Sequence, residues 1–470
     1  MTASVNLTLK PYRDLCASKK PQPLLNGLAK VPALNSTLFP HQAHGVDFAL
    51  RTGRAGLFYD TGLGKTAMML EWGHHIVRET NKPVMMLAPL AVGSQHVREA
   101  ERIGIEARVS RFGQAPDKPC ITVTNYERLE KFDPAEFGGI ILDESSILKS
   151  QAGATSKKLI ETFKGYRFRL AGTATPAPND HTELGQHSEF LGVMDADEML
   201  MRWFLHDSAN TKIWRLKGHA IRPFWDWVAS WARCVSKPSD LGFSDEGFIL
   251  PPLNVQRHII EADRSINAGE EKDGQGRLFR VPDRSATAIH KEKRMTINDR
   301  AAKVAELVAA IDGQPCVIWV DTNYEADAVK EAIPTAFEIR GTETVDVKES
   351  KLDAFSRGEI SVLLTKPSIA GFGLNWQHCH NTIFAGVNFS YESYYQALRR
   401  FWRFGQKKAV NAHVVCADTE LEIASVVDRK ATDHDTMKRE MAASMRRAAV
   451  TKEVFEPYQP NREATLPAWI

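Results

Sequence analysis

The stretch that decides the fold is an apolar segment running into a glycine-rich turn, Tyr59-Asp60-Thr61-Gly62-Leu63-Gly64-Lys65-Thr66. A helical pattern over 66–78 follows it. Such a turn lets backbone N–H groups converge on a phosphate chain, with a helix N-terminus behind them. Lys65 would reach the β- and γ-phosphates, and the Thr66 hydroxyl would bind Mg²⁺. Tyr59 stands where the common form of this loop has a glycine, so an ordinary strand–helix turn with an incidental lysine is the alternative.

Short apolar strands alternate with amphipathic helices over two long parts of the chain. In the second part, Val304, Leu307, Val308 and Ile311 have the spacing of a core-facing helical stripe. Parallel sheets are built from this alternation. We therefore expect two parallel-sheet α/β domains, with strands at Gly56–Tyr59, Val84–Ala88, Ile121–Thr124, Ile140–Leu142 and Phe168–Ala171, then at Val317–Val320, Val362–Thr365, Thr382–Gly386 and His413–Cys416.

Length and composition set the outer limits. The 470 residues, 43% hydrophobic and 25% charged, allow two to four domains at ~100–200 residues each and exclude wholesale disorder, collagen and coiled coil. No apolar run approaches the ~18 residues of a spanning helix. The start of the chain does not resemble a secretory signal, and the six cysteines are scattered, so we expect a cytoplasmic protein without a membrane. A net charge of +2 neither favours nor excludes nucleic acid.

A second motif reads Gly139-Ile140-Ile141-Leu142-Asp143-Glu144-Ser145-Ser146. A strand that ends in adjacent acids places two carboxylates at the edge where open α/β sheets bind ligands. Asp143 can then hold Mg²⁺, and Glu144 can orient or deprotonate an attacking water, as hydrolysis of a γ-phosphate requires. The alternative is an ordinary acidic turn after a core strand. The glycine-rich turn upstream in the same α/β stretch makes this alternative less favoured.

A third motif lies near the end of the chain, Gln396-Ala397-Leu398-Arg399-Arg400-Phe401-Trp402-Arg403-Phe404-Gly405-Gln406. Arg400 and Arg403 share a helical face, and guanidinium groups suit the oxygens of a phosphoryl group in transit. A solvated basic helix explains this segment equally well when it is taken alone.

Five tryptophans fall within 203–231, interleaved with arginine and lysine. Aromatic side chains beside cations can stack on bases of a nucleic acid. However, Phe224, Trp227, Val228 and Trp231 have helical spacing, which favours packing of a small helical insert.

In their order along the chain, these segments resemble the Swi/Snf-like branch of the superfamily 2 helicase-type ATPases. Leu38–Val46 resembles the opening motif of that branch, and the glycine-rich turn and the acid pair resemble motifs I and II. Motifs Ia, Ib, III, V and VI are similar to Leu87–Leu90, Thr124–Glu127, Gly172–Pro176, Ala370–Asn375 and Gln396–Gln406. The chain departs from the branch at Ser146, where DESS replaces DEAH or DEGH, and at Tyr59, where an acid is usual. A compact bacterial or phage-encoded member fits best.

The resemblance implies a role for each matching residue. Glu144, Arg400 and Arg403 would be catalytic, with the two arginines reaching across a cleft between the domains. Thr66 and Asp143 would hold Mg²⁺, and Thr173 and Thr175 would couple hydrolysis to movement. ATP would be held by Gln42, which reads adenine, and by Thr61, Gly62, Leu63, Gly64, Lys65, Thr66, Gly373, Asn375 and Gln396. Pro89, Asn125 and Tyr126 would line the nucleic-acid track.

The resemblance also implies two tandem RecA-like domains with an ATP cleft between them. We expect an N-terminal extension at 1–36, the ATP-binding domain at 37–195, the Trp-rich helical insert at 196–260, a charged linker at 261–298, the second domain at 299–432 and a C-terminal tail at 433–470. The expected function is ATP-driven movement along DNA, duplex more than single-stranded, with targeting left to a protein partner or to DNA structure. A strand-separating DNA or RNA helicase and a nucleotide-switched binding module with little turnover remain open.

Overall fold

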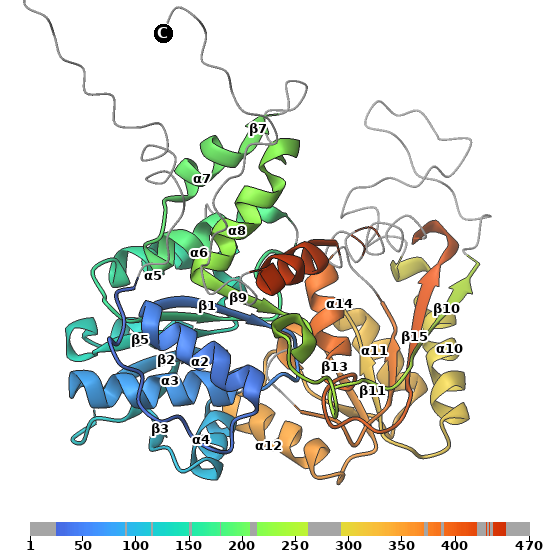
Figure 1. Cartoon of the computed structure of the whole chain (residues 1–470). Helices are drawn as coiled ribbons and strands as arrows, with labels where there is room; N and C mark the ends of the chain where they lie inside the picture. Colours follow the sequence, from blue (N-terminus) through green and yellow to red (C-terminus); the bar gives the residue numbers. More distant parts are fainter. Residues whose placement is uncertain are drawn as a thin grey trace, which may run out of the picture.

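The computed structural model describes residues 25–89, 92–113, 116–149, 153–178, 180–206, 214–261, 293–370, 375–386, 390–420, 429, 432 and 436–447. These residues form two α/β parts that lie side by side, each around its own parallel sheet (Figure 1). The expected fold class is therefore confirmed: two parallel-sheet domains follow one another in the chain.

The first sheet has the strand order β3-β4-β2-β5-β6-β1-β9 and is parallel throughout. Most of its strands are fully buried apolar runs, such as Val-Met-Met-Leu-Ala in β2, as expected where helices cover both faces. Its strands are β1 (Arg54–Tyr59), β2 (Val84–Ala88), β3 (Ala107–Val109), β4 (Ile121–Asn125), β5 (Gly139–Asp143), β6 (Arg169–Gly172) and β9 (Ala232–Val235). The α-helices of this part are α2 (Pro40–Thr52), α3 (Lys65–Thr80), α4 (Gly93–Arg102), α5 (Ala154–Phe163), α6 (Leu184–Leu191), α7 (Ala196–Trp203) and α8 (Ile221–Trp231), and its 3₁₀ helices are η1 (Tyr126–Lys131), η2 (Pro134–Glu136), η3 (Ser145–Lys149), η4 (His181–Glu183), η5 (Gly218–Ala220) and η6 (Pro238–Leu241).

The second sheet has the order β10-β15-β14-β11-β13-β12 and is also parallel. Two buried clusters, one around Trp319 and Trp376 and one around Val304 and Ile318, form its core. Its strands are β10 (Leu253–Ile260), β11 (Cys316–Trp319), β12 (Phe337–Glu338), β13 (Val362–Thr365), β14 (Asn381–Phe384) and β15 (Val410–Ala417). Its helices are α10 (Ile297–Ala310), α11 (Asn323–Ala332), α12 (Val345–Ser356), α13 (Pro367–Ala370), α14 (Tyr391–Leu398) and the 3₁₀ helix η7 (Asp418–Glu420).

The range 196–260, expected as a helical insert, is divided between the two sheets. Its strand β9 pairs with β1 of the first sheet, and its strand β10 pairs with β15 of the second. The helices α7 and α8 and the small antiparallel pair of β7 (Phe204–His206) and β8 (Trp214–Leu216) project from the first part. Sequence periodicity missed β9 because a four-residue buried strand directly after a helix has no period of its own. Of the expected linker 261–298, residues 262–292 lie outside the described residues.

Packing explains most of the tryptophans of this segment. Trp203, Trp225, Trp227 and Trp231 are at most 4% exposed, while Trp214 is only partly buried. The rings of Trp203 and Trp227 are 4.5 Å apart at their centroids, and Trp231 lies 5.9 Å from Phe58 of β1. The packing interpretation is therefore confirmed for these four side chains, which attach α8 to the first sheet.

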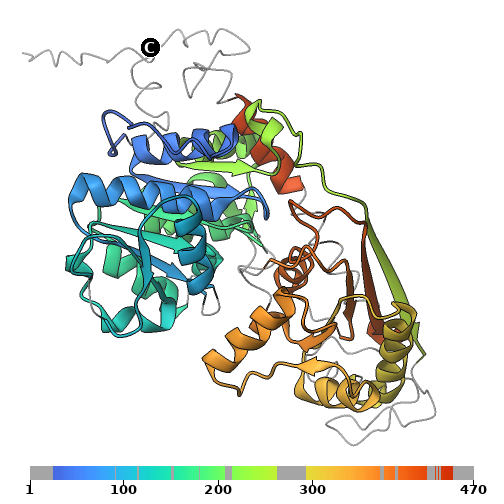
Figure 2. The ribbon, with the colours of Figure 1, turned by 90° about the horizontal axis from the view of Figure 1, so that it is seen from below.

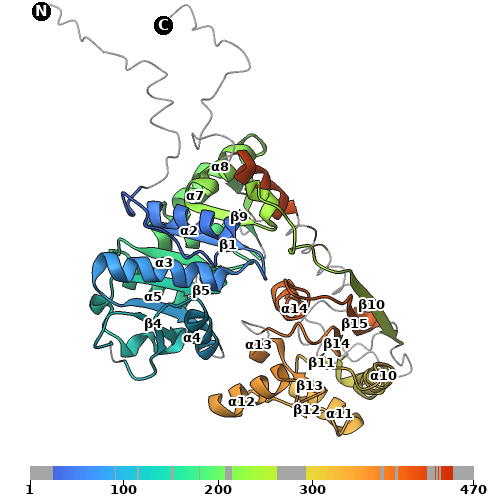
Figure 3. The same ribbon diagram turned by 60° about the horizontal axis from the view of Figure 1, so that its bottom comes forward.

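Helical residues 436–447, in the range expected as a C-terminal tail, return to the first part of the molecule. Figures 1, 2 and 3 all place this dark red helix beside α8 and β9. Met437, Met441 and Met445 are buried in the core cluster of the first part. Ser444 and Arg447 each lie 2.9 Å from Asp226 of α8. The chain thus crosses from the first part to the second and comes back.

Among the described residues, no helix combines the length and apolarity needed to cross a membrane.

Candidate nucleotide site

All strands of the first sheet run the same way, so their carboxyl ends gather at one edge. Asp60 follows β1, Pro89 follows β2, Asn125 ends β4, Asp143 ends β5 and Thr173 follows β6. Side chains from motifs that are distant in sequence therefore meet at the edge where parallel sheets bind ligands.

The glycine-rich turn has the backbone that a phosphate loop requires. Gly62 and Gly64 have φ angles of 93° and 80°, in the left-handed region that favours glycine. A Cβ atom on Gly64 would lie 2.0 Å from Gln42 Nε2, and one on Gly62 would lie 2.7 Å from the backbone nitrogen of Phe404. Helix α3 begins at Lys65, so its N-terminus points at the loop.

Lys65 opens α3 directly after the turn that follows β1. Its Nζ atom donates a 2.7 Å hydrogen bond to the carbonyl oxygen of Tyr59. Burial lowers the pKa of Lys65 to about 8, although Glu144, Asp60 and Asp143 oppose the shift. The ammonium is thus short of compensating charge, and an anionic phosphate would supply it.

Gln42 supports the loop from helix α2. Its Nε2 atom donates to the carbonyl oxygen of Leu63 at 3.0 Å, and its Oε1 atom accepts from the backbone of Phe39 at 3.0 Å. The nearby ring of His41 is 3.3 Å from the same carbonyl oxygen. Gln42 therefore contacts the glycine-rich turn directly, and its reading of adenine stays a prediction.

The two acidic residues after β5 have different surroundings. His96 Nε2 lies 2.8 Å from Asp143 Oδ2, and Tyr126 donates a 2.7 Å hydrogen bond to the Asp143 carbonyl oxygen. Burial disfavours a charged imidazole, but the Asp143 carboxylate outweighs that effect and raises the pKa of His96. Glu144 has a φ of 54°, rare for a residue with a side chain. Burial and then Asp143 raise the pKa of Glu144, as suits a group that accepts a proton.

A series of hydrogen bonds connects Glu144 to the second domain. Thr173 Oγ1 donates to Glu144 Oε2 at 3.3 Å and accepts from the Thr175 backbone at 3.1 Å. Gln396 Nε2 donates to Thr175 Oγ1 at 3.3 Å, and Arg400 donates to the Gln396 carbonyl and side-chain oxygens at 3.0 and 3.1 Å. Motifs II, III and VI thus form one continuous network.

The two arginines of motif VI face the first domain. Arg400 is 1% exposed, and burial lowers its pKa to about 10, with Glu144 and Asp143 opposing. Burial and then Arg400 and Arg399 lower the pKa of Arg403 to about 9, with Glu144 again opposing. The two buried guanidinium groups thus disfavour each other's charge, which a bound anion would offset.

A cluster around Asp60 joins three separate segments. Its carboxylate accepts hydrogen bonds from Tyr395 at 2.6 Å and from Lys438 at 3.0 Å, and it pairs with Arg399 at 3.2 Å. Arg399 also donates to the Thr61 carbonyl oxygen at 2.7 Å. Burial favours the neutral acid, but Arg399, Lys438 and Tyr395 together hold the pKa of Asp60 well below its usual range.

The structure brings most of the expected nucleotide residues to one edge, with some exceptions. Gly373 lies outside the described residues, and Asn375 is exposed. Of the expected track residues, Pro89 and Asn125 line a pocket beside the nucleotide edge. Tyr126 does not line that pocket, and its hydroxyl donates a hydrogen bond to the backbone of Asp143.

The residues present fit Mg·ATP by their chemistry. The cradle of Gly62 and Gly64 leaves no room for a Cβ atom, and burial lowers the pKa of Lys65, Arg400 and Arg403, which an anionic ligand would offset. Asp143 and Thr66 offer the oxygen ligands that Mg²⁺ prefers.

Sequence reasoning missed His96, Tyr395 and Lys438 and assigned no role to Asp60. Arg399, to which no site role was assigned from sequence, is 4% exposed and donates a hydrogen bond to the glycine-rich turn. The spacing of Met437, Met441 and Met445 along one helical face could have shown that this helix is buried. Nothing in the sequence pairs His96 with Asp143.

Comparisons with known proteins bear on both halves. Residues 299–405 match the helicase conserved C-terminal domain. Over 446 residues the chain is 23% identical to the mouse (Mus musculus) DNA annealing helicase and endonuclease ZRANB3, covering 85% of this chain and 40% of that relative. Over 161 residues it is 29% identical to SWI/SNF-related matrix-associated actin-dependent regulator of chromatin subfamily A-like protein 1 of Xenopus tropicalis, covering 32% and 17%.

A third relative, putative protein p41 of Acyrthosiphon pisum secondary endosymbiont phage 1, is 23% identical over 453 residues, covering 83% of this chain and 95% of that protein. The chain thus spans less than half of the two animal relatives and nearly all of the phage one. Among solved structures, Saccharomyces cerevisiae Dbp5 bound to RNA and ADP BeF3 matches with a TM-score of 0.54 at 12% identity, covering 87% of this chain and 93% of that one. That likeness concerns the fold.

Proposed function

Since this chain is a superfamily 2 helicase-type protein of the Swi/Snf-like branch, we propose that it hydrolyses ATP in the cleft between its two domains and uses the cycle to move along duplex DNA. The observation that carries the proposal is the hydrogen-bond series from Glu144 through Thr173, Thr175 and Gln396 to Arg400. It joins the proposed base in one domain to Arg400, one of the two proposed arginines, in the other.

In the proposed site, the turn from Thr61 to Thr66 binds the phosphates, and Lys65 neutralises their charge. Mg²⁺, held by Thr66 and Asp143, would supply charge neutralisation at the phosphate oxygens. Glu144, whose pKa is raised by burial, accepts the proton of the attacking water. Arg400 and Arg403 stabilise the charge that develops in the transition state.

The two domains move because their contacts with the nucleotide differ before and after hydrolysis. The arginines contact a γ-phosphate only while it is present, so hydrolysis removes one reason for the two domains to stay together. The Thr175–Gln396 hydrogen bond transmits that change to α14, which belongs to the second domain. Repeated closing and opening would move the two domains alternately along a nucleic-acid backbone.

The test is the rate of ATP hydrolysis with no polymer, single-stranded DNA, duplex DNA or RNA, with Lys65→Ala as the inactive control. Stimulation by duplex DNA, with displacement of a third strand from a triplex but no unwinding, is the expected result. Unwinding of a forked duplex would favour the strand-separating helicase. A rate that responds to no polymer would overturn the motor and favour a nucleotide-switched module.

A further inference from the structure

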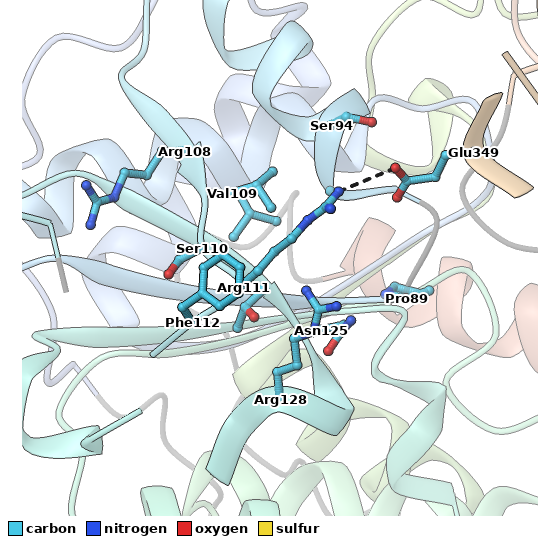
Figure 4. A pocket seen from close by; sticks show the side chains of 13 residues that line it. Pro89, Ser94, Arg108, Val109, Ser110, Arg111, Phe112, Asn125, Arg128 and Glu349 are labelled. Carbon is cyan, nitrogen blue, oxygen red and sulfur yellow. Dashed lines mark ion pairs between the residues drawn. The ribbon is translucent and has the colours of Figure 1, made fainter. Parts of the chain in front are cut away.

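A pocket of about 360 Å³ lies beside the nucleotide edge, at the carboxyl ends of β2, β3 and β4 (Figure 4). Pro89 and Asn125 line it, but most of its wall comes from residues outside every motif of the family resemblance. These include Arg108, Arg111, Phe112 and Arg128 of the first domain and Glu349 of α12 in the second domain.

The charge and shape of the wall suit a polynucleotide. Figure 4 shows Arg111 extending across the pocket, with Arg128 and Asn125 below it. Guanidinium groups bind phosphate oxygens through paired hydrogen bonds. Phe112, beside Arg111 in the sequence, is 82% exposed, and an exposed aromatic ring next to cations is a stacking surface for a base.

Two buried polar atoms of the wall also point to a ligand. Thr124 and Asn125 are 5% and 8% exposed. Within the described part of the chain, Thr124 Oγ1 and Asn125 Oδ1 have no hydrogen-bond partner. Buried polar groups are nearly always bonded, so atoms left without partners in a pocket indicate that a solute or solvent completes them.

One carboxylate already faces the arginines. Glu349 Oε2 lies 3.5 Å from Arg111 Nη2, and this ion pair joins the two domains. A second pair between the same two domains, Arg98 with Asp353 at 3.7 Å, does not line the pocket. Glu349 therefore presents to Arg111 the same kind of anionic oxygen that a phosphate would.

We propose that this pocket binds a backbone phosphate of nucleic acid through Arg111 and Arg128, and that Glu349 is an internal competitor for Arg111. The proposal rests on the proposed function and adds its regulation. A strand entering the pocket replaces the Glu349 carboxylate, which breaks a contact between the domains. Occupancy of the track and the relative position of the domains are thereby coupled through one side chain.

The test is the affinity of the full chain, without nucleotide, for fluorescent duplex and single-stranded oligonucleotides, measured by anisotropy over a range of salt concentrations. Glu349→Gln should bind about two- to fivefold more tightly at low salt, since an exposed ion pair is a weak competitor. Arg111→Gln should weaken binding and reduce the slope of log K against log salt by about 0.7–0.9, the loss of one phosphate contact. Adding Glu349→Gln to Arg111→Gln should then have no effect.

Asp353→Asn is the matched control, because it breaks a second ion pair between the domains without touching the pocket. If Asp353→Asn raised the affinity for oligonucleotides as much as Glu349→Gln, weaker contact between the domains would explain both effects. That result would overturn the proposed competition of Glu349 for Arg111. If Arg111→Gln changed neither the affinity nor the salt slope, the pocket would not bind a strand through Arg111. The proposed ATP-driven movement would be unaffected by that result. Competition by inorganic phosphate as strong, per phosphate, as that of an oligonucleotide would show a simple anion site and overturn the strand assignment. Failure of the wild-type chain to bind any oligonucleotide would overturn phosphate binding in the pocket. The dependence of ATP hydrolysis on nucleic acid would then test the proposed function separately.

Discussion

Lys438 donates a 3.0 Å hydrogen bond to Asp60 across 378 positions of sequence. Asp60 begins the glycine-rich turn, and Lys438 belongs to a helix that follows the second domain. The same ammonium donates to the Tyr395 hydroxyl at 2.8 Å. The glycine-rich turn, α14 and the C-terminal helix therefore meet at one carboxylate, so a change in any one of them alters the contacts of the other two.

Replacing Lys438 with Met should lower the free energy of unfolding of the first domain by about 1–3 kcal/mol. The loss stays below that of an isolated buried pair, because Arg399 and Tyr395 still face Asp60. Thermal unfolding and amide hydrogen exchange of residues 436–447 measure it. Glu440→Gln, an exposed change on the same helix, is the control, and equal melting temperatures for the two variants would contradict the prediction.

The contribution of Lys438 to the free energy of unfolding should be independent of pH between about 5 and 9. Burial lowers the pKa of Lys438, but Asp60 and Tyr395 outweigh burial and the opposing Arg399, so the net shift is upward. Stability from a raised lysine pKa is complete below the unfolded value of about 10.4 and is lost only as the pH rises through the folded value.

Asp60 behaves in the opposite sense. Its pKa is depressed, so its contribution is complete above the unfolded value of about 3.9 and is lost as the pH falls through the folded value. The difference in melting temperature between wild type and Lys438→Met should hence be the same at pH 5.5, 7.5 and 9. A difference that halves between pH 6 and 8 would show that another group controls the contact.

Thr175→Val should lower kcat for ATP with little change in KM. The change keeps the shape of the side chain and removes the hydroxyl that accepts from Gln396, so the two domains lose their link beside the proposed base. Steady-state hydrolysis with duplex DNA measures the effect. Thr122→Val is the matched control, because among the described residues the buried Thr122 hydroxyl has no hydrogen-bond partner. A raised KM with unchanged kcat would place Thr175 in binding instead.

Arg403→Ala should slow ATP hydrolysis by ~10³-fold or more, the usual effect of losing an arginine that stabilises the transferred phosphoryl group. Binding of a fluorescent ATP analogue should persist, because the phosphate loop is intact. Lys407→Ala, an exposed change directly after motif VI, should leave the rate unchanged. Comparable rates for wild type and Arg403→Ala would reject its placement across the cleft.

Trp227→Ala should destabilise the first domain by about 3–5 kcal/mol, the range for removing a large buried aromatic side chain. Trp227 is 2% exposed and packs between Trp203 and Trp231. Trp214→Ala, at a partly buried position, should cost much less. Should Trp227→Ala fold with near-normal stability but lose affinity for DNA, the stacking role would replace the packing role.

Local patterns were sufficient for most of the fold. The strands expected at Val84–Ala88 and Val362–Thr365 have the bounds of β2 and β13. Short, largely apolar runs between turns are typical of strands that are buried on both faces of a parallel sheet. The glycine-rich turn was recognisable because only glycine tolerates the left-handed backbone of Gly62 and Gly64. The order of the motifs then predicted the family.

Tertiary structure alone decided which distant side chains meet. The imidazole of His96 beside Asp143, the carboxylate of Asp60 beside Lys438 and the ion pair of Arg111 with Glu349 carry no sequence signature, because each joins residues whose spacing follows no helical or strand period. Strand β9 was likewise assigned by pairing with β1, which depends on the whole sheet. The sequence by itself thus determined the two sheets and the chemistry at their edges. Folding determined the partners, because charge and hydrogen bonding at a buried edge depend on what the rest of the chain brings there.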